Sequence, residues 1–427
     1  MEKGDKIIFF LTICALFGLN IYSMSGNCFI TSEKSYTTYT IKGNISQTAP
    51  AFLDDGFAPL MEQYRRKASK KLVPQLTKFR SGSVPRVLLW SDPLKRKFWE
   101  AVFRQVTEGY CPLPCEIIYD VQKKATADAI IIHLSGAKDY KTVTKNLSPR
   151  DPRQPWVMLT FEAPPYARTA YQTRFSKYNG LYNRTMTYRR DSDIVINHGF
   201  VVPKEDTIFL PQPWVVPPVM KVGNLSKNLA VAFISHCPTA SRRMQYIREV
   251  QKYATVHIYG SCGDLKCGSS MFIANRYNAT TDKCLKQAGE TYLFYFAFEN
   301  SFCKEYATEK VYNLLHYSIV PVVWGSANYS SILPPNSYVN ANDYTPKELA
   351  ERLMYLQDHP EEYQKYFEWK KYYQPSTVSG ERIVCQMCSR LYEPEFYQYK
   401  VYEDFADWFV LKSNCMIMWS LWNSRIL

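Results

Sequence analysis

The sequence predicts an α/β protein with two Rossmann-like, doubly wound domains that face each other across a cleft, preceded by a single N-terminal transmembrane helix. From residue 84 onward, short apolar runs alternate with polar, helix-capable segments, which is the pattern of parallel sheets covered by helices. A Pro-rich passage, LPQPWVVPP at 210–218, interrupts this alternation and indicates a domain boundary. Near the N-terminus, IIFFLTICALFGLNIYSM contains no charge, and about 18 apolar residues suffice to cross a hydrocarbon core.

The chain divides into six segments on these grounds. The expected segments are a cytosolic tail at 1–6, a signal anchor at 7–24, a stem at 25–80, a first domain at 81–212, a second at 213–375, and a C-terminal segment at 376–427 that packs back on the body. Strands are expected at RVLLW, CEIIYD, DAIIIHLS and WVMLTFEA in the first domain, and at NLAVAFIS, TVHIYG, YLFYFAFEN and IVPVVWG in the second. Helices are expected through RRMQYIREVQKY and EKVYNLLHY and from about residue 345 to 359.

The residues that flank the apolar N-terminal stretch predict that the rest of the chain lies in the lumen. No A-x-A-like cleavage site closes the stretch, so a retained signal anchor is favoured over a removed signal peptide. Lys3 and Lys6 precede it and support a cytosolic N-terminus. Six N-x-S/T sequons fit a lumenal body, although Pro149 weakens the one at Asn146. Glycosylation is therefore expected at Asn44, Asn183, Asn224, Asn278 and Asn328. A formal charge of +13 could suit nucleic-acid binding, but the anchor and the sequons favour a membrane protein that contacts no nucleic acid.

Twelve cysteines predict disulfide bonds, because the lumen is oxidising. Apart from Cys14 and Cys28, in or beside the expected membrane segment, most of them form local clusters along the sequence. The clusters are Cys111/Cys115, Cys262/Cys267/Cys284 and Cys385/Cys388, which predict local stapling. Zinc at CPLPC and CQMC is the alternative, but too few His and Cys residues surround them at finger-like spacing.

Cations occupy two expected helix starts in the second domain. Arg242 and Arg243 follow the end of the NLAVAFIS run, and Lys310 follows the end of YLFYFAFEN. A cation at a helix N-terminus is disfavoured by about 0.3 to 1 kcal/mol, and a bound anion reverses that sign. Amides, helix dipole and cations together predict a diphosphate site, with solvated surface cations as the alternative. Glu309, beside Lys310, offers an acceptor for a pair of ribose hydroxyls.

The segment FYFAFENSFCKEYATEKVYNLLHYSIVPVVWG resembles the signature of the alpha-1,3-fucosyltransferases, glycosyltransferase family 10. YRRDSDI at 188–194, ISHCPTASRRMQY with VHIYGSCGDLKC, and CQMC near the end are similar to further blocks of this family, particularly of its invertebrate members. The resemblance covers about residues 84–395. It implies a type II Golgi membrane enzyme of GT-B architecture that transfers L-fucose from GDP-β-L-fucose, with inversion, to the 3-hydroxyl of an N-acetylglucosamine.

The resemblance also implies roles for individual residues. The family's diphosphate-binding arginine and lysine match Arg243 and Lys310, and its ribose carboxylate matches Glu309. The Asn and Tyr that line the nucleotide pocket match Asn300 and Tyr306. The first domain then binds the acceptor and the second binds GDP-fucose.

Three positions depart from the family's pattern. Glu305 stands where Asp is usual, and Ala307 stands where a larger aliphatic residue is common. After RRDSDI, NHG at 197–199 replaces a more typical PYG. The first two changes are conservative, whereas His198 affects the detailed shape of the expected cleft.

Inverting transfer needs a base for the acceptor hydroxyl and stabilisation of the departing diphosphate. WVMLTFEAPPY places Glu162 at the end of a first-domain strand, before a Pro-Pro turn that fixes the loop. We therefore expect Glu162 to be the base, as the resemblance also implies, with Arg243 and Lys310 stabilising the leaving group. The alternative is a strand-end glutamate in solvent.

Asp191 and Asp193 form a D-x-D motif. In many GT-A glycosyltransferases this motif holds Mn2+, because hard carboxylates suit such ions. Here Arg189 and Arg190 precede it, and it lies before the Pro-rich boundary. We interpret it as a salt-linked structural element. No obligatory cofactor or metal is expected, and Mn2+ or Mg2+ would at most stimulate the enzyme.

The function expected is fucosylation of N-glycans, at the core or the antennae, or of LacNAc and LacdiNAc-type acceptors. One alternative is a catalytically silent, membrane-tethered glycan-binding protein. Another is a metal-dependent GT-A transferase that uses Asp191 and Asp193. Intact Glu162, Arg243, Glu309 and Lys310 favour the enzyme over the silent protein, because a binding module needs no base and leaving-group cations together.

Overall fold

The structure, a computed structural model, describes most of the chain from residue 84 to residue 416. The described ranges are 84–90, 113–134, 151, 153–167, 175–204, 227–267, 282–377 and 380–416, with four short strands nearer the N-terminus, Ser23–Met24 (β1), Asn27–Cys28 (β2), Ile30–Ser32 (β3) and Ser35–Thr37 (β4). The predicted cytosolic tail, the signal anchor up to residue 22 and the Pro-rich passage at 210–218 lie outside the described residues. Within the described part, no helix has both the length and the apolar character needed to cross a membrane.

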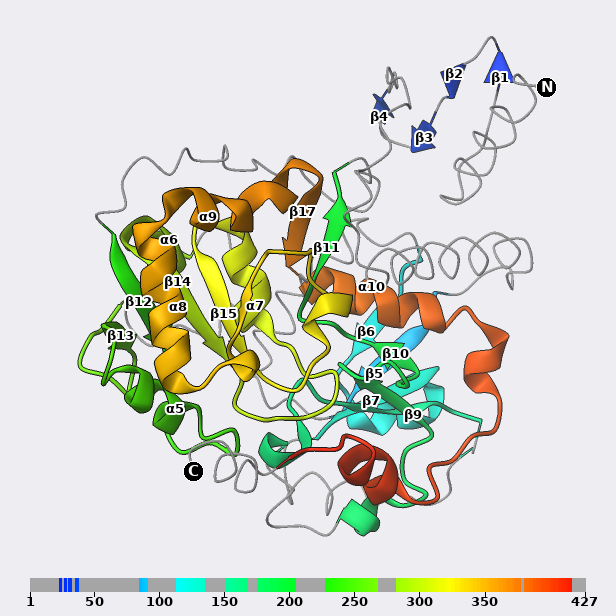
Figure 1. Cartoon of the computed structure of the whole chain (residues 1–427). Helices are drawn as coiled ribbons and strands as arrows, with labels where there is room; N and C mark the ends of the chain where they lie inside the picture. Colours follow the sequence, from blue (N-terminus) through cyan, green and yellow to red (C-terminus); the bar gives the residue numbers. More distant parts are fainter. Residues whose placement is uncertain are drawn as a thin grey trace, which may run out of the picture.

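The described residues form two separate parallel sheets, which confirms the α/β prediction (Figure 1). The strands of the first sheet are Arg86–Leu89 (β5), Glu116–Ile118 (β6), Ala129–His133 (β7), Trp156–Leu159 (β8), Arg184–Thr187 (β9) and Ile194–Val195 (β10). Those of the second are Asn228–Phe233 (β12), Val256–Tyr259 (β13), Tyr292–Phe298 (β14), Val320–Trp324 (β15) and Val339–Asn340 (β16). All eight apolar runs of the sequence contain one of these strands.

Both sheets reverse their winding direction next to their first strand. Among the described strands the order is β10-β9-β8-β7-β5-β6 in the first sheet and β13-β12-β14-β15-β16 in the second. In the second sheet, the reversal lies between β12 and β14. Open α/β sheets bind ligands at the carboxyl ends of the strands beside such a switch point. The loops after β12 and β14 are therefore the place to look for a site.

Helices cover the sheets as the apolar periodicity predicts. The α-helices are Arg243–Val250 (α5), Lys283–Thr291 (α6), Glu309–Tyr312 (α7), Pro346–Asp358 (α8), Pro360–Gln364 (α9) and Gly380–Arg390 (α10). Helix α8 begins with a capping box in which Thr345 and Glu348 exchange side-chain to backbone hydrogen bonds. The helix expected through EKVYNLLHY is α-helical only over α7.

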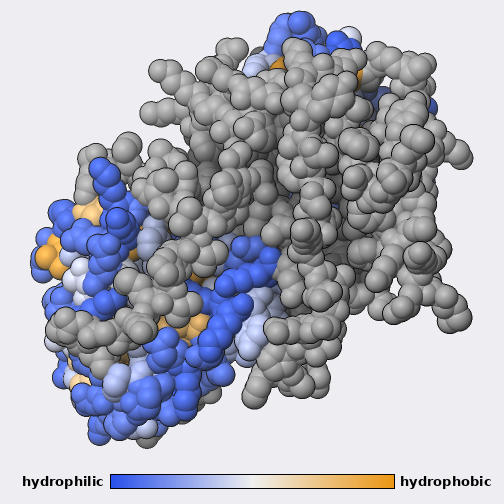
Figure 2. Space-filling view, turned by 90° about the horizontal axis from the view of Figure 1, so that it is seen from above, coloured by the Kyte–Doolittle hydropathy of each residue, from blue (hydrophilic) through white to orange (hydrophobic). Residues whose placement is uncertain are grey.

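Shorter helical turns connect these elements. The 3-10 turns are Val121–Thr126 (η3), Pro164–Tyr166 (η4), Phe175–Tyr178 (η5), Asn313–His316 (η8), Tyr329–Ser331 (η9), Ala341–Asp343 (η10), Lys365–Lys371 (η11) and Pro394–Tyr397 (η12). A π-helical turn covers Asp407–Leu411 (η13). Where Figure 2 colours the surface, hydrophilic residues predominate and hydrophobic ones are scattered, and singly scattered apolar residues are normal on the surface of a folded protein.

An antiparallel ribbon lies between the two parallel sheets. It pairs Gly199–Pro203 (β11), which follows the first sheet, with Tyr373–Thr377 (β17), which follows the helices of the second (Figure 1). Gly199 packs on Tyr312 of α7 so closely that a Cβ atom there would overlap the tyrosine side chain. A glycine is therefore required where β11 passes α7.

The C-terminal segment returns to the first sheet and packs on both of its faces. Helix α10 contributes Ile383, Val384 and Met387 to a core cluster with β5, β7 and β8. On the opposite face, Phe405 and Phe409 join a second cluster that contains the rest of the first sheet's apolar side chains. The segment that follows the second sheet in sequence thus completes the core of the first.

The prediction of local disulfide stapling is wrong for the CPLPC and CQMC motifs. Cys388 bonds Cys115, 273 residues away, and Cys385 is disulfide-bonded as well, so neither Cys in α10 is left for zinc. Packing of α10 on the sheet brings these distant cysteines together. Cys111 lies outside the described residues.

The cluster at 262–284 also pairs differently from expectation. Cys267 bonds Cys284 locally, whereas Cys262 bonds Cys237 in the loop after β12. That bond closes the loop after β12 onto the loop after β13. Sequence spacing could not reveal this pairing. The pairing depends on β12 and β13 being parallel neighbours, which brings the loops that follow them together.

Candidate active site

The loops after β12 and β14 meet directly at the switch point of the second sheet. Ser241 connects them twice, since its N–H donates to Asn300 O at 3.1 Å and its hydroxyl donates to Glu299 O at 2.6 Å. Trp324, at the end of β15, donates its indole N–H to Ser241 O. The carboxyl ends of three neighbouring strands are therefore held in one hydrogen-bonded unit.

Arg243 begins α5, as the sequence predicts, but its terminal nitrogens bond to the main chain. Its Nη1 donates to Phe298 O at 2.8 Å and its Nη2 donates to His236 O at 3.1 Å, and the residue is 5% exposed. Burial lowers the pKa of Arg243, and the nearby Glu299 carboxylate acts in the opposite direction. Among the described residues, the buried Nε has no hydrogen-bond partner.

Lys310 lies in the first turn of α7 and is neutralised from within the protein. Its Nζ contacts Glu299 Oε2 at 3.1 Å and Glu309 Oε1 at 3.6 Å, and donates to Thr308 Oγ1 at 2.7 Å. Glu299 is 1% exposed and also accepts from the N–H and hydroxyl of Thr308. An internal carboxylate thus accounts for a cation at this helix start even without a bound anion, which the sequence argument did not foresee.

Glu162 reaches this loop from the first sheet. Its Oε2 accepts from Tyr306 Oη at 3.2 Å and from Asn300 Nδ2 at 3.4 Å. Burial, with the Glu162 carboxylate next in size, raises the pKa of Tyr306 well above its usual value, so its hydroxyl stays a donor. Both contacts engage the same carboxylate oxygen. Within the described residues, Oε1 receives no hydrogen bond.

Further contacts join the two halves around this point. Tyr166, in the turn after Glu162, accepts at its hydroxyl from Ala240 N at 2.9 Å. Glu305 has a left-handed backbone, with φ of 65°, and its Oε2 accepts from Arg190 N at 2.9 Å. These bonds place the Glu162 carboxylate from the first sheet beside the loop after β14 of the second.

Two family models match consecutive parts of the chain. The model "Fucosyltransferase, N-terminal" matches residues 82–199, and the model "Glycosyltransferase family 10 (fucosyltransferase) C-term" matches residues 224–408. The chain belongs to glycosyltransferase family 10. The family 10 chain is 33% identical to "Alpha-(1,3)-fucosyltransferase C" of Drosophila melanogaster over 76% of its own length and 78% of the relative's.

Other relatives carry fucosyltransferase names as well. "Glycoprotein 3-alpha-L-fucosyltransferase A" of Drosophila melanogaster is 33% identical over 77% of this chain and 61% of that relative. A crystal structure of an alpha1,3-fucosyltransferase matches with a TM-score of 0.47 and 15% identity, over 75% of this chain and 94% of that one. The membership makes this protein a glycosyltransferase of the fucosyltransferase class.

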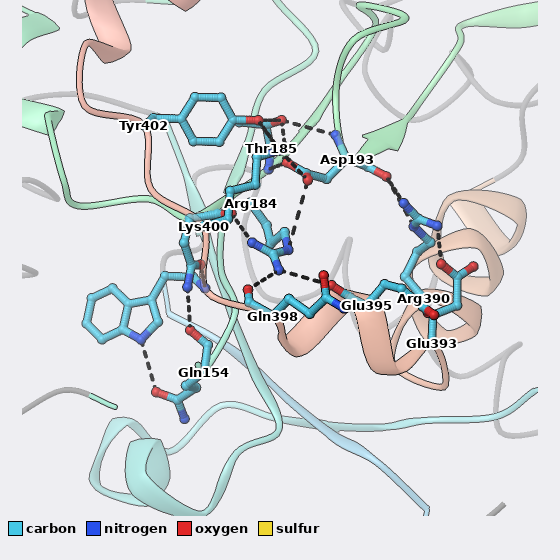
Figure 3. A network of polar contacts seen from close by, with 12 residues as sticks. Gln154, Arg184, Thr185, Asp193, Arg390, Glu393, Glu395, Gln398, Lys400 and Tyr402 are labelled. Atoms are coloured by element: carbon cyan, nitrogen blue, oxygen red, sulfur yellow. Dashed lines mark hydrogen bonds and ion pairs between the residues drawn. The ribbon is translucent and has the colours of Figure 1, made fainter. Parts of the chain in front are cut away.

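The D-x-D of this family 10 chain is engaged by cations. Asp191 pairs with Arg189 at 2.6 Å. Asp193 pairs with Lys400 at 2.6 Å and lies 3.9 Å from Arg184. Figure 3 shows Asp193 at the centre of a polar network that joins β9 to the C-terminal segment. Over the described ranges, no three His, Cys, Asp or Glu side chains are grouped to hold a metal ion.

The sequons of the family 10 chain are not equally accessible. Asn183 is 1% exposed, its Oδ1 accepts from Trp156 N at 2.6 Å, and its Nδ2 donates to Gln154 O at 2.9 Å. A glycan on Nδ2 would have no room at this buried position, so the structure contradicts the expectation of glycosylation at Asn183. Asn328 is exposed. The predicted sites Asn44, Asn224 and Asn278 lie outside the described residues.

Two parts of the site escaped sequence reasoning. Glu299 directly follows the seven buried residues of β14 and is itself buried. A carboxylate at such a position was a usable sign in the sequence of a buried partner for a cation. The second part is the strap, by which we mean residues 413–416. Cys415 bonds Cys303 in the loop after β14, and Ser413 O accepts from Lys304 N at 2.8 Å. The C-terminal segment therefore fastens the loop after β14.

Replacing Cys415 with Ser is expected to weaken donor binding as well as stability. Loss of a native disulfide typically costs about 2 to 5 kcal/mol, and this one also holds the loop that carries Asn300 and Tyr306. We expect a donor KM raised about tenfold and a lower unfolding midpoint, measured by kinetics and by denaturant titration. Cys284→Ser, which removes a bond away from this loop, should lower the midpoint alone. An unchanged KM in Cys415→Ser would contradict a positioning role for the strap.

Proposed function

We propose that this chain is an inverting alpha-1,3-fucosyltransferase that moves L-fucose from GDP-β-L-fucose to the 3-hydroxyl of an N-acetylglucosamine in N-glycans or LacNAc and LacdiNAc-type glycans. We also propose that it is a single-pass type II protein of the Golgi membrane with a lumenal catalytic part. The family membership and the names of the Drosophila relatives support the reaction. The apolar N-terminal stretch and the disulfides support the compartment.

One observation carries the proposal for the mechanism, namely the contact between Glu162 and the loop after β14. Glu162 comes from the sheet assigned to the acceptor, and the loop leads to Lys310, assigned to the donor. In the reaction, the acceptor hydroxyl attacks the anomeric carbon of fucose while the bond to GDP breaks, and its proton passes to Glu162. Oε1 is the oxygen available to take that proton, because Asn300 and Tyr306 hold Oε2.

The leaving diphosphate gains negative charge as the bond breaks. Lys310 Nζ and Arg243 Nε are the cationic donors proposed to face it, which is electrostatic stabilisation of the transition state. Glu309 is proposed to accept from the ribose hydroxyls of the nucleotide. No step of this scheme requires a metal ion, and a divalent cation is proposed at most to stimulate it.

The deciding experiment is a transfer assay with the full chain, GDP-fucose and a defined set of N-glycan acceptors, with linkage mapping of the product by mass spectrometry. The proposal expects an alpha-1,3-linked fucose and activity that survives EDTA. Activity abolished by EDTA would favour a metal-dependent site at Asp191 and Asp193. Glycan binding without release of GDP would favour a silent binding protein.

A further inference from the structure

His198 lies where the chain passes from the first sheet to the second. It directly precedes Gly199, the residue whose missing Cβ lets β11 pack on Tyr312 of α7. This close approach sets His198 beside Glu309, the first residue of the same helix. The position of His198 therefore follows from a steric requirement one residue further on.

Both ring nitrogens of His198 face oxygen acceptors. Nδ1 lies 3.4 Å from Glu309 Oε2, and Nε2 lies 3.2 Å from Phe161 O. The side chains of His198 and Glu309 are 10% and 16% exposed, so water competes little for these contacts. The ring thus spans the distance from the turn after β8 to the first residue of α7.

The ring also touches the surroundings of Glu162. It meets Phe161, the residue before Glu162, edge to face at a centroid distance of 6.2 Å. It meets Tyr306, a donor to Glu162, edge to face at 6.4 Å. His198 thus contacts both the residue that precedes the proposed base and a side chain that holds it.

We propose that His198 is a positioning residue, whose ring joins the turn at Phe161 and Glu162 to Glu309 and so sets the base in register with the sugar nucleotide. The inference rests on the proposed function, because it assumes that Glu162 and Glu309 serve the acceptor and the donor. The groups that face the ring are Glu309 from α7, with Lys310 behind it, and Phe161 and Tyr306 beside Glu162. None of these is a metal ligand.

The first test measures GDP-fucose binding by calorimetry, since its phosphate groups carry no proton that titrates near neutral pH. His198→Phe keeps an aromatic ring but loses both polar contacts, and we expect Kd to rise about tenfold. His198→Gln keeps one N–H donor, so its Kd should lie between those of the wild type and His198→Phe. The matched control is His257→Phe on β13, where Nδ1 contacts Tyr292 Oη at 2.8 Å, and its Kd should equal that of the wild type.

Denaturant unfolding separates positioning from mere packing. A lower unfolding midpoint with an unchanged Kd in both His198 variants would overturn the proposal.

A measurement that needs no ligand distinguishes this inference from the proposed function. The chain has six histidines, so the imidazole signals of His198 in proton–nitrogen spectra can be assigned by their loss in His198→Phe. We expect these signals to move in Glu309→Gln, which removes the charged partner of Nδ1. A wild type that binds no GDP-fucose would refute the proposed function, whereas His198 signals unchanged by Glu309→Gln would refute the link.

Discussion

Glu162→Gln is expected to lower kcat by about 10²- to 10⁴-fold, the usual contribution of a general base. Glutamine keeps the shape of the side chain and can still accept from Tyr306 and Asn300 through its carbonyl oxygen. It cannot take the proton of the acceptor hydroxyl. GDP binding should be unchanged, because the loop after β14 keeps its contacts. Radiolabelled fucose transfer and calorimetric titration with GDP measure the two quantities on the same preparation.

The control for Glu162→Gln lies on the neighbouring turn. Tyr166→Phe removes the hydroxyl that accepts from Ala240 N, so it weakens a contact between the same two halves without touching the carboxylate. It should change kcat far less than Glu162→Gln does. Turnover of Glu162→Gln within a few-fold of the wild type would show that another group accepts the proton.

Lys310→Met is expected to damage both catalysis and stability. Loss of the cation proposed to face the leaving group should lower kcat by about 10²- to 10³-fold, as loss of one preorganised donor does. The same change leaves the Glu299 carboxylate buried without its cation, which costs about 3 to 5 kcal/mol in comparable pairs. The two bonds from Thr308 to Glu299 favour the lower end of that range. Transfer kinetics and denaturant unfolding measure the two losses.

A second substitution separates these two effects. In Lys310→Met with Glu299→Gln, no unpaired charge remains in the core, so part of the lost stability should return while kcat stays low. Equal stability of Lys310→Met and the wild type would mean that the buried pair matters little. Recovery of kcat in the double variant would mean that Lys310 acts only through folding.

Much of the fold was predictable because its strands are buried on both faces. All seven residues of β14 are buried, and such strands appear in a sequence as unbroken apolar runs. The limits of α8 were predictable from the Thr345 and Glu348 capping box. The strand order and the antiparallel ribbon of β11 and β17 were not, because they depend on contacts between distant segments.

The site was predictable only as far as local sequence determines position. Arg243 and Lys310 do begin helices, as their place after apolar runs indicates. Their partners were missed, since the bond from Lys310 to Glu299 arises when the intervening loop folds back. Cys303 and Cys415 are 112 residues apart, and no local spacing indicates such a bond. Asn183 was misjudged because a sequon carries no information on burial.

The strap has a consequence for biosynthesis. The strands of the second sheet leave the ribosome well before Cys415 does, yet the loop that holds Asn300 and Tyr306 is fastened only when Cys415 reaches Cys303. A nascent chain can thus assemble the second sheet while the loop after β14 is still unfastened, and the bond forms only where thiols are oxidised. Chains that end before Cys415 would lack this fastening.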